Sequence, residues 1–377
     1  MKKKIILIFI FVMFSAGMAF AQSSSPSQSQ TQTQIGKQEY LKAVVVKIKS
    51  QGVISKYGYH NPYQTLGVEI TSGSENGRYI TIDYGKDTQI IKQQEVSVGE
   101  EIILEKSTDS SGKTTYSVYD AYRLTSLMFF VAVFFVLILL VSGLKGLGSL
   151  LGMLFSLTVI LLFIVPNILS GKDPLTITVI GSTIIIFVST YLAHGISKKT
   201  TLALVSTLIS LVLAASFSIL AINITNLTGL GNEDFSNLLQ MGPTSVINIS
   251  GLFLSGIIIG TLGALNDVTT TQAATVFELK DANSRIKFPE LVKRSFNVGK
   301  EHIASLVNTL ILAYAGSSLG IFIFLILNPL HIPYWVILNN EILSDEIIRI
   351  IAGSIGLILS VPIVTLISAL SVSTKPD

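Results

Sequence analysis

Seven long apolar runs follow Ser126, and each approaches the roughly 20 residues that an α-helix needs to cross a bilayer. Charged residues make up only 13% of the chain, against about 25% in soluble domains, and the deficit is concentrated in this C-terminal part. We therefore predict an all-α membrane bundle of about seven transmembrane helices over residues 123–377. The predicted spans are 126–143, 147–169, 176–193, 201–222, 247–265, 304–328 and 347–371.

Basic residues are spread unevenly over the connections between these spans. If the chain before the first span lies outside the cell, the inner connections and the tail carry Lys145, Lys198, Lys199, Lys280, Arg285, Lys287, Lys293, Arg294, Lys300 and Lys375. The outer connections carry Lys172, Asp173, Glu233, Asp234 and Glu341. Lys and Arg accumulate on the cytoplasmic side of membrane proteins. We therefore predict an extracytoplasmic N-terminal region, an odd number of spans and a cytoplasmic C-terminus.

The N-terminus has the pattern of a secretory signal peptide over residues 1–21. Lys2 to Lys4 form a basic region, an apolar region follows, and Ala19-Phe20-Ala21 is a small-x-small cleavage site. An uncleaved anchor helix is the alternative, although the apolar region is short for a span. Residues 22–37 are mainly Ser, Gln and Thr, too polar to fold, so we predict a disordered tether.

Residues 38–122 have a different pattern, with short strand-like runs separated by turn signals. The strand-like runs are 41–48, 64–70, 78–84, 101–105 and 114–119, and the turn signals are Gly52, 73–77, 98–100 and 110–112. This spacing is typical of a small all-β barrel or sandwich. We predict an extracytoplasmic β domain, and we leave open whether it is a plain folded module or binds a ligand or partner.

Several function classes are excluded by the composition. The chain has no cysteine, which rules out zinc–thiolate sites and cysteine nucleophiles, and its four histidines form no metal-binding motif. It contains no phosphate-binding loop, no HExxH motif and no nucleophile elbow. A formal net charge of +3 is too small to indicate a nucleic-acid partner. We expect no enzymatic activity, no cofactor and no metal site, and we expect the lipid bilayer as the main partner.

One face of the fifth predicted span combines small residues with a carboxylate. Gly256, Gly260 and Gly263 share this face with Asp267 and Thr270 at helical spacing. Small residues allow close helix packing, and an acidic group in a span usually faces a bundle interior or a water-filled cavity. Two interpretations remain open for Asp267: contact with an ion or substrate, or a structural role at the start of a cytoplasmic helix.

The sixth predicted span carries a second face of small residues, which includes Gly316 and Gly320. Asn308 lies about one turn inside this span, where an amide without a partner would be costly. We therefore predict that the two spans pack together through Gly256, Gly260, Gly263, Gly316 and Gly320. The intervening residues 280–300 mix basic and apolar residues, a pattern typical of an interfacial helix on anionic lipid.

Five segments of the chain resemble the YibE/F-like multi-pass membrane proteins of bacteria. They are residues 143–147, 171–174, 195–200, 263–268 and 308–316, and they occur in the family order. The Asp267 and Tyr314 segments are the most specific, although threonines follow Asp267 where small and apolar residues are more usual. The resemblance implies an exported N-terminal region and a helical bundle in the bacterial cytoplasmic membrane, but it supplies no mechanism.

Two hypotheses from different classes follow. The first is transport of a small solute or ion, with contacts at Asn266, Asp267, Thr270, Asn308 and Tyr314; in the absence of an ATP-binding motif, a gradient or a partner subunit would drive it. The second is a membrane scaffold or sensor whose β domain binds an extracytoplasmic partner. A polar cavity reaching Asp267 and Asn308 would favour transport. Either protein could work as a homo-oligomer or with a partner subunit.

Overall fold

The computed structural model describes residues 37–56, 59–86, 89–109, 112–231, 235, 247–328 and 331–373. The predicted signal peptide and nearly all of the predicted tether lie outside these residues, as do Glu233, Asp234 and Lys375. The chain forms two compact units that divide between Leu137 and Ile138. We describe each unit by itself.

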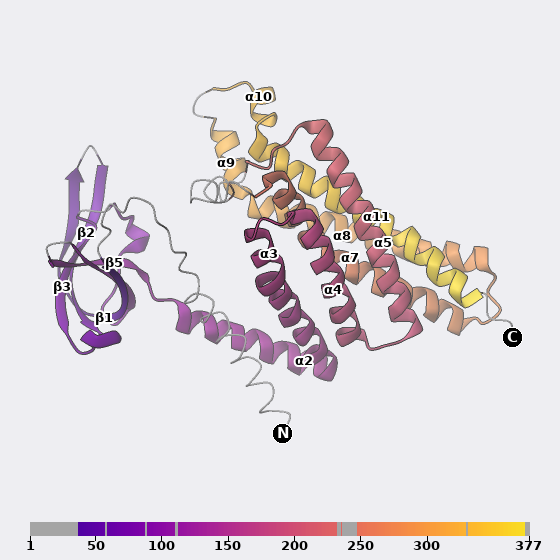
Figure 1. Cartoon of the computed structure of the whole chain (residues 1–377), viewed down its shortest axis with the longest axis horizontal. Helices are drawn as coiled ribbons and strands as arrows, with labels where there is room; N and C mark the ends of the chain where they lie inside the picture. The colour runs from indigo at the N-terminus through magenta and orange to yellow at the C-terminus, as the bar shows by residue number, and fades with distance from the viewer. Residues whose placement is uncertain are drawn as a thin grey trace. The chain divides into compact units, whose positions relative to one another are not determined.

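The N-terminal unit contains a five-stranded antiparallel sheet that curls into a half-barrel (Figure 1). The strands are β1 (Lys37–Lys56), β2 (Tyr59–Ile70), β3 (Tyr79–Tyr84), β4 (Glu101–Thr108) and β5 (Thr114–Ala121), in the order β3-β2-β1-β4-β5. Buried side chains alternate with exposed ones, as in β4, where Ile102 and Leu104 are fully buried. They form one core with Leu41, Val45, Leu66 and Val68 from β1 and β2. The predicted small β domain is confirmed.

The turn predicted at Gly52 is wrong, because β1 continues through this position to Lys56. Gly52 pairs with Tyr63 of β2, and a Cβ atom on Gly52 would lie 3.0 Å from the Tyr63 ring. The glycine therefore makes room for an aromatic ring instead of reversing the chain. Two irregularities in the pairing, next to Val45 and Ile48, bend this long strand so that the sheet can curl.

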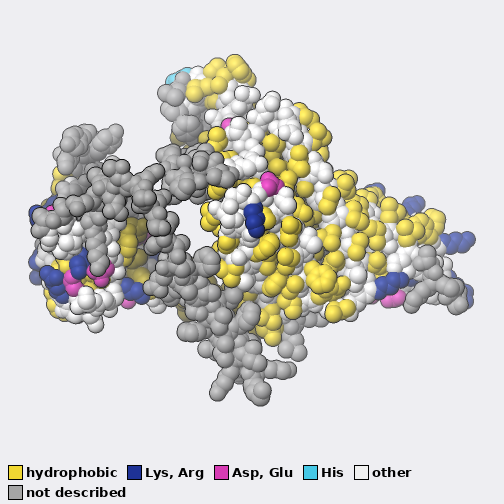
Figure 2. All heavy atoms as spheres, in the orientation of Figure 1, with side chains coloured by type: hydrophobic (Ala, Val, Ile, Leu, Met, Phe, Trp, Pro, Cys, Tyr) yellow, Lys and Arg dark blue, Asp and Glu magenta, His cyan; other side chains and the backbone are white. Residues whose placement is uncertain are grey.

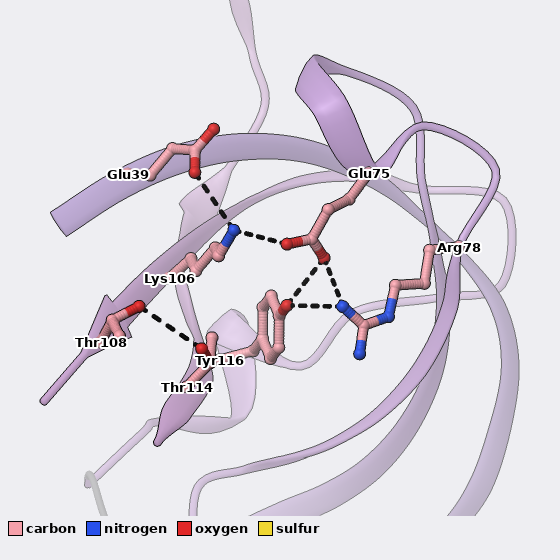
Figure 3. A network of polar contacts seen from close by, with 7 residues as sticks. All are labelled: Glu39, Glu75, Arg78, Lys106, Thr108, Thr114 and Tyr116. Atoms are coloured by element: carbon pink, nitrogen blue, oxygen red, sulfur yellow. Dashed lines mark hydrogen bonds and ion pairs between the residues drawn. The ribbon is translucent and has the colours of Figure 1, made fainter. Parts of the chain in front are cut away.

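A network of charged side chains joins elements that are far apart in the sheet (Figure 3). Glu75, in the short 3₁₀ helix Gly73–Glu75, receives hydrogen bonds from Lys106 of β4 at 2.5 Å and from Tyr116 of β5 at 2.7 Å. Arg78 donates to Glu75 at 2.8 Å and to the Tyr116 hydroxyl at 3.1 Å. Lys106 also reaches Glu39 of β1. The network links the start of β3 to β5, the two outer strands.

The hydrogen bond from Lys106, together with those from Tyr116 and Arg78, lowers the pKa of Glu75 to about 2. The pKa of Lys106 is raised, mainly by its bond to Glu75 and then by Glu39. Both groups therefore stay charged across the physiological range, and the network is an ion pair under ordinary conditions.

The C-terminal unit is a helical bundle, which α2 joins to the β domain. Its helices are α2 (Leu124–Val159), α3 (Val165–Leu169), α4 (Pro174–His194), α5 (Lys198–Thr225), α7 (Ile249–Ala282), α8 (Phe288–Ser317), α9 (Leu319–Leu327), α10 (Tyr334–Leu338) and α11 (Glu341–Ser373). A break at Gly143, where φ is 55°, divides α2 into two spans, and a π-helical turn at Ile160–Ile164 joins α2 to α3.

Six helices of the described residues are long and apolar enough to cross a membrane, and a bent pair makes up to seven. The bent pair is α8 with α9, whose axes differ by 70° at Ser318. The prediction of a multi-pass bundle is confirmed, and the sixth span predicted over 304–328 falls on this bent pair. Figure 2 shows hydrophobic side chains along the flank of the bundle, and Lys and Arg gather at the end where α11 finishes.

The helix α7 lies at the centre of the bundle and packs against α4, α5, α8 and α11. Glycines on other helices allow close approaches. A Cβ atom on Gly353 of α11 would lie 2.6 Å from Thr261 of α7, and one on Gly356 would lie 2.8 Å from Ala214 of α5. These positions allow the helix backbones to pack tightly, as small residues do in membrane bundles.

Two further expectations are corrected at the end of α7. Asp267 does not start a helix, because α7 continues without a break to Ala282. The apolar residues of segment 280–300 also do not form an outward lipid-binding face: Ile286 and Leu291 are buried in a cluster with Val276 and Ala369. The mixed pattern arises because the first turns of α8 expose their charged residues and pack their apolar face on α7 and α11.

Candidate functional site

A pocket of about 590 Å³ lies where α4 ends and α5 begins, against α7. We call it the His194 pocket, and its polar lining consists of His194, Lys199, Thr200, Thr270 and Thr271. The turn that forms it follows from local chemistry. Gly195 ends α4 with a φ of 74°, which favours glycine, and the Ser197 hydroxyl caps α5 by accepting from the Thr200 amide.

Two of the predicted contact residues lie on the α4 side of α7. The Thr190 hydroxyl of α4 donates to the Asn266 side-chain oxygen at 2.7 Å. Thr270 lines the His194 pocket, and its hydroxyl donates to the Asn266 backbone oxygen at 2.8 Å. Asn266 is therefore engaged in helix packing, whereas Thr270 is placed to meet a bound molecule.

Asp267 lies next to this pocket but on the uncovered face of α7, where its side chain is exposed. It lies within electrostatic range of His194 and His302. Thr271, one turn further along the same face, lines the His194 pocket. The carboxylate therefore lies beside the pocket, with the two imidazoles close to it.

The remaining predicted contacts, Asn308 and Tyr314, lie elsewhere on α8. Asn308 is exposed, and Tyr314 is half-buried. The Tyr314 hydroxyl reaches α7, because a Cβ atom on Gly260 would lie 2.6 Å from it. Gly260 and Asp267 are seven residues apart, roughly 10 Å along a helix axis. The structure thus brings Asn266, Asp267 and Thr270 together and leaves Asn308 and Tyr314 apart from them.

The small-residue faces of α7 and of α8 with α9 are open as far as the described residues show. A Cβ atom on Gly256, Gly263, Gly316 or Gly320 would meet no described atom within 4 Å, so Gly260 alone among the five predicted packing glycines contacts the other helix. On α7 the open face begins near Tyr314 and ends at Asp267 and the His194 pocket.

The sequence did not predict several buried polar contacts inside the bundle. Gln272 of α7 donates to the Ser295 backbone oxygen of α8 and to the Thr365 hydroxyl of α11, each at 2.8 Å. The Thr207 and Thr269 hydroxyls of α5 and α7 are 2.5 Å apart. These side chains satisfy one another where water is excluded. A glutamine within an apolar helix was the available signal.

A second pocket, of about 390 Å³, was also missed. We call it the Asp345 pocket, and it is lined by Asp345, Glu346 and Arg349 of α11, by Ser317 and Ser318 at the end of α8, and by Gly231, Gly320, Ile321 and Ile342. Arg349 lies 3.7 Å from Glu346 and over the Phe253 ring of α7. The signal in the sequence was the acids Asp345 and Glu346 followed by Arg349 within the predicted span 347–371.

The model of the YibE/F-like protein family matches residues 130–374 of this chain. The match covers more than half of the chain and includes almost all of the helical unit. No protein with curated annotation matches the sequence significantly. No solved structure matches it significantly either.

Proposed function

Because this multi-pass membrane chain belongs to the YibE/F-like family, whose model covers its helical unit, we propose that it moves a small solute or an ion across the membrane. The observation that carries the proposal is the uncovered face of α7. This face combines glycines with the Asp267 carboxylate, and it ends at the polar His194 pocket. A helix face of this kind offers a polar solute room beside the backbone and a charge to bind it.

The position of Asp267 supports a functional role. It lies 18 residues after Ile249, or roughly 27 Å along the axis of α7, close to the thickness of the hydrocarbon layer. A carboxylate at the centre of a span costs about 2.5–3.5 kcal/mol, and less toward the boundary. His194 and His302 lie within electrostatic range of the carboxylate and reduce part of this cost. The site is therefore suited to exchange a proton or a cation near the membrane boundary.

The test is complementation of a deletion strain, with growth and metabolite or ion profiles as the readout. We expect Asp267→Asn to accumulate normally and to lose the activity, because the amide keeps the shape of the side chain and removes its charge. Asp281→Asn is the matched control, since Asp281 is an exposed carboxylate near the end of the same helix. Full complementation by Asp267→Asn would reduce Asp267 to a structural residue.

A second candidate function is a scaffold or sensor that acts through the β domain. A pocket of about 570 Å³ favours it, lined by Tyr84, Asp120, Tyr122 and Arg123 among others. Arg123 and Asp120 form an ion pair of 2.7 Å at its rim, which offers both charges to a partner. Loss of activity on Asp120→Ala, with Asp267→Asn fully active, would favour this function over transport.

A further inference from the structure

We propose that the Asp345 pocket binds a small monovalent cation, held by the Asp345 and Glu346 carboxylates and by hydroxyl oxygens at the end of α8. The proposal does not depend on transport, because the pocket lies away from the Asp267 face and its occupancy can be measured without any activity.

The first argument is a buried charge without an ion-pair partner. Asp345 is 2% exposed, and no side chain of the described residues donates a hydrogen bond to its carboxylate oxygens. The Gly231 backbone amide is the nearest donor, and a Cβ atom on Gly231 would lie 2.7 Å from Oδ2. A buried carboxylate without an ion-pair partner is costly, so a positive charge in the pocket would be strongly favoured.

The second argument is the balance of charge in the pocket. Two carboxylates and one guanidinium line it, and the guanidinium of Arg349 is already next to Glu346 and the Phe253 ring. The neighbouring Glu341 does not compete for the ligand, because one of its oxygens accepts from the Thr228 amide and hydroxyl and from the Gly229 amide. One negative charge therefore remains for a ligand to neutralise.

The third argument is the break between α8 and α9. Ser317 and Ser318, where the helix axis turns by 70°, line the pocket. The last turn of a helix has backbone carbonyls without helical partners and carries partial negative charge. Interrupted helices in membrane transporters use such ends to bind cations. Because the Tyr314 and Ser318 carbonyls already accept hydrogen bonds, the break adds chiefly the Ser317 and Ser318 hydroxyl oxygens to the two carboxylates.

The number of ligands indicates a monovalent ion. Within the described part of the chain, no three His, Asp or Glu side chains are placed to hold a metal ion together, whereas calcium sites use six to eight oxygens with several carboxylates. The pocket volume of about 390 Å³ exceeds that of a bare ion, so a few water molecules can complete the shell. Sodium, potassium and ammonium are the candidates of this class.

The experiment measures the Tm of the purified full-length protein in detergent. The reference buffer contains the chloride salt of N-methylglucamine, a bulky organic cation. In the test buffers, sodium, potassium or ammonium chloride takes its place at the same ionic strength. We expect at least one small cation to raise the Tm of the parent with saturation, because a ligand that binds the folded state stabilises it. Asp345→Asn should abolish this rise and Glu346→Gln should weaken it. Glu301→Gln, an exposed carboxylate on α8, should keep it.

Three outcomes would overturn the proposal. The first is a parent Tm that does not depend on the small cation, and the second is an equal rise in the parent and in Asp345→Asn. The third is a parent that is stabilised only by acid in cation-free buffer, which would mean that a proton neutralises Asp345. If Asp345→Asn fails to accumulate, Glu346→Gln and Ser318→Ala carry the same comparison. Because this experiment does not measure activity, a negative result would say nothing about the role proposed for Asp267.

Discussion

At the scale of single residues, the surroundings of a glycine decide its role, and two glycines of α8 show this. A Cβ atom on Gly299 would collide with Val361 of α11 and lie 3.0 Å from the Gln272 side chain. One on Gly316 would meet nothing within 4 Å. Gly299 therefore helps to hold α8, α7 and α11 together, whereas no described residue packs against Gly316 in this way.

This contrast gives a matched pair of substitutions. Gly299→Ala should lower the Tm of the purified protein, because overpacking costs about 1–3 kcal/mol and displaces α11. Gly316→Ala should leave the Tm unchanged or raise it slightly, since alanine favours a helix by up to about 1 kcal/mol. Thermal unfolding in detergent measures both. An equal loss of Tm for Gly316→Ala would show that something outside the chain, such as a second copy, covers this face.

At the scale of elements, ion pairs join separate elements of the β domain, and close packing joins the helices of the bundle. The charged network joins β4 and β5 to the segment before β3 through Glu75 (Figure 3). Surface ion pairs are individually weak, but here a single carboxylate receives three donors. Its contribution should therefore be visible in the pH dependence of stability.

The pKa of Glu75 is lowered to about 2 in the folded domain, chiefly by Lys106, whereas an unfolded glutamate titrates near 4.3. A lowered pKa means that the stabilisation is fully present above the unfolded value and is lost as the pH falls from there toward 2. Limited proteolysis of the full chain between pH 7 and pH 3 should show this loss. Glu75→Gln should be cleaved faster at pH 7 and should depend less on pH, while Glu101→Gln should match the parent.

At the scale of the whole molecule, the basic residues predict which end of the bundle faces the cytoplasm. The α7–α8 connection carries Arg285 and Lys287, and both side chains lie outside the core. Lys and Arg also gather at the end of the bundle where α11 finishes (Figure 2). From the positive-inside rule we predict that this end faces the cytoplasm and that the β domain lies outside.

Introduced cysteines test this orientation against a background without native thiols. In intact cells, a membrane-impermeant thiol reagent should label Ser117→Cys in β5 and should not label Ser284→Cys in the α7–α8 connection. Both positions are exposed, so folding does not hide either of them. Ser284→Cys should react once the membrane is permeabilised. Labelling of Ser284→Cys alone in intact cells would reverse the predicted orientation.

The sequence by itself determined the classes of element in this protein. The hydropathy of a span is a sum over about 20 consecutive residues and does not depend on contacts with distant segments. The spans could therefore be placed from the local sequence alone. The alternation of buried and exposed residues is equally local, and it revealed the strands. The role of Gly52 could not be predicted, because a glycine in a turn and a glycine beneath a tyrosine ring are the same residue type in the sequence.

Only the tertiary structure decided which polar and small residues meet. Asp345 lies 27 residues after Ser318 in the sequence, yet the fold places both around one pocket and leaves the carboxylate without a side-chain donor among the described residues. Asp267, which local spacing singled out, lies on an open face instead. The physical reason is that burial and pairing depend on contacts between distant segments, and helical periodicity says which residues share a face but not what covers it.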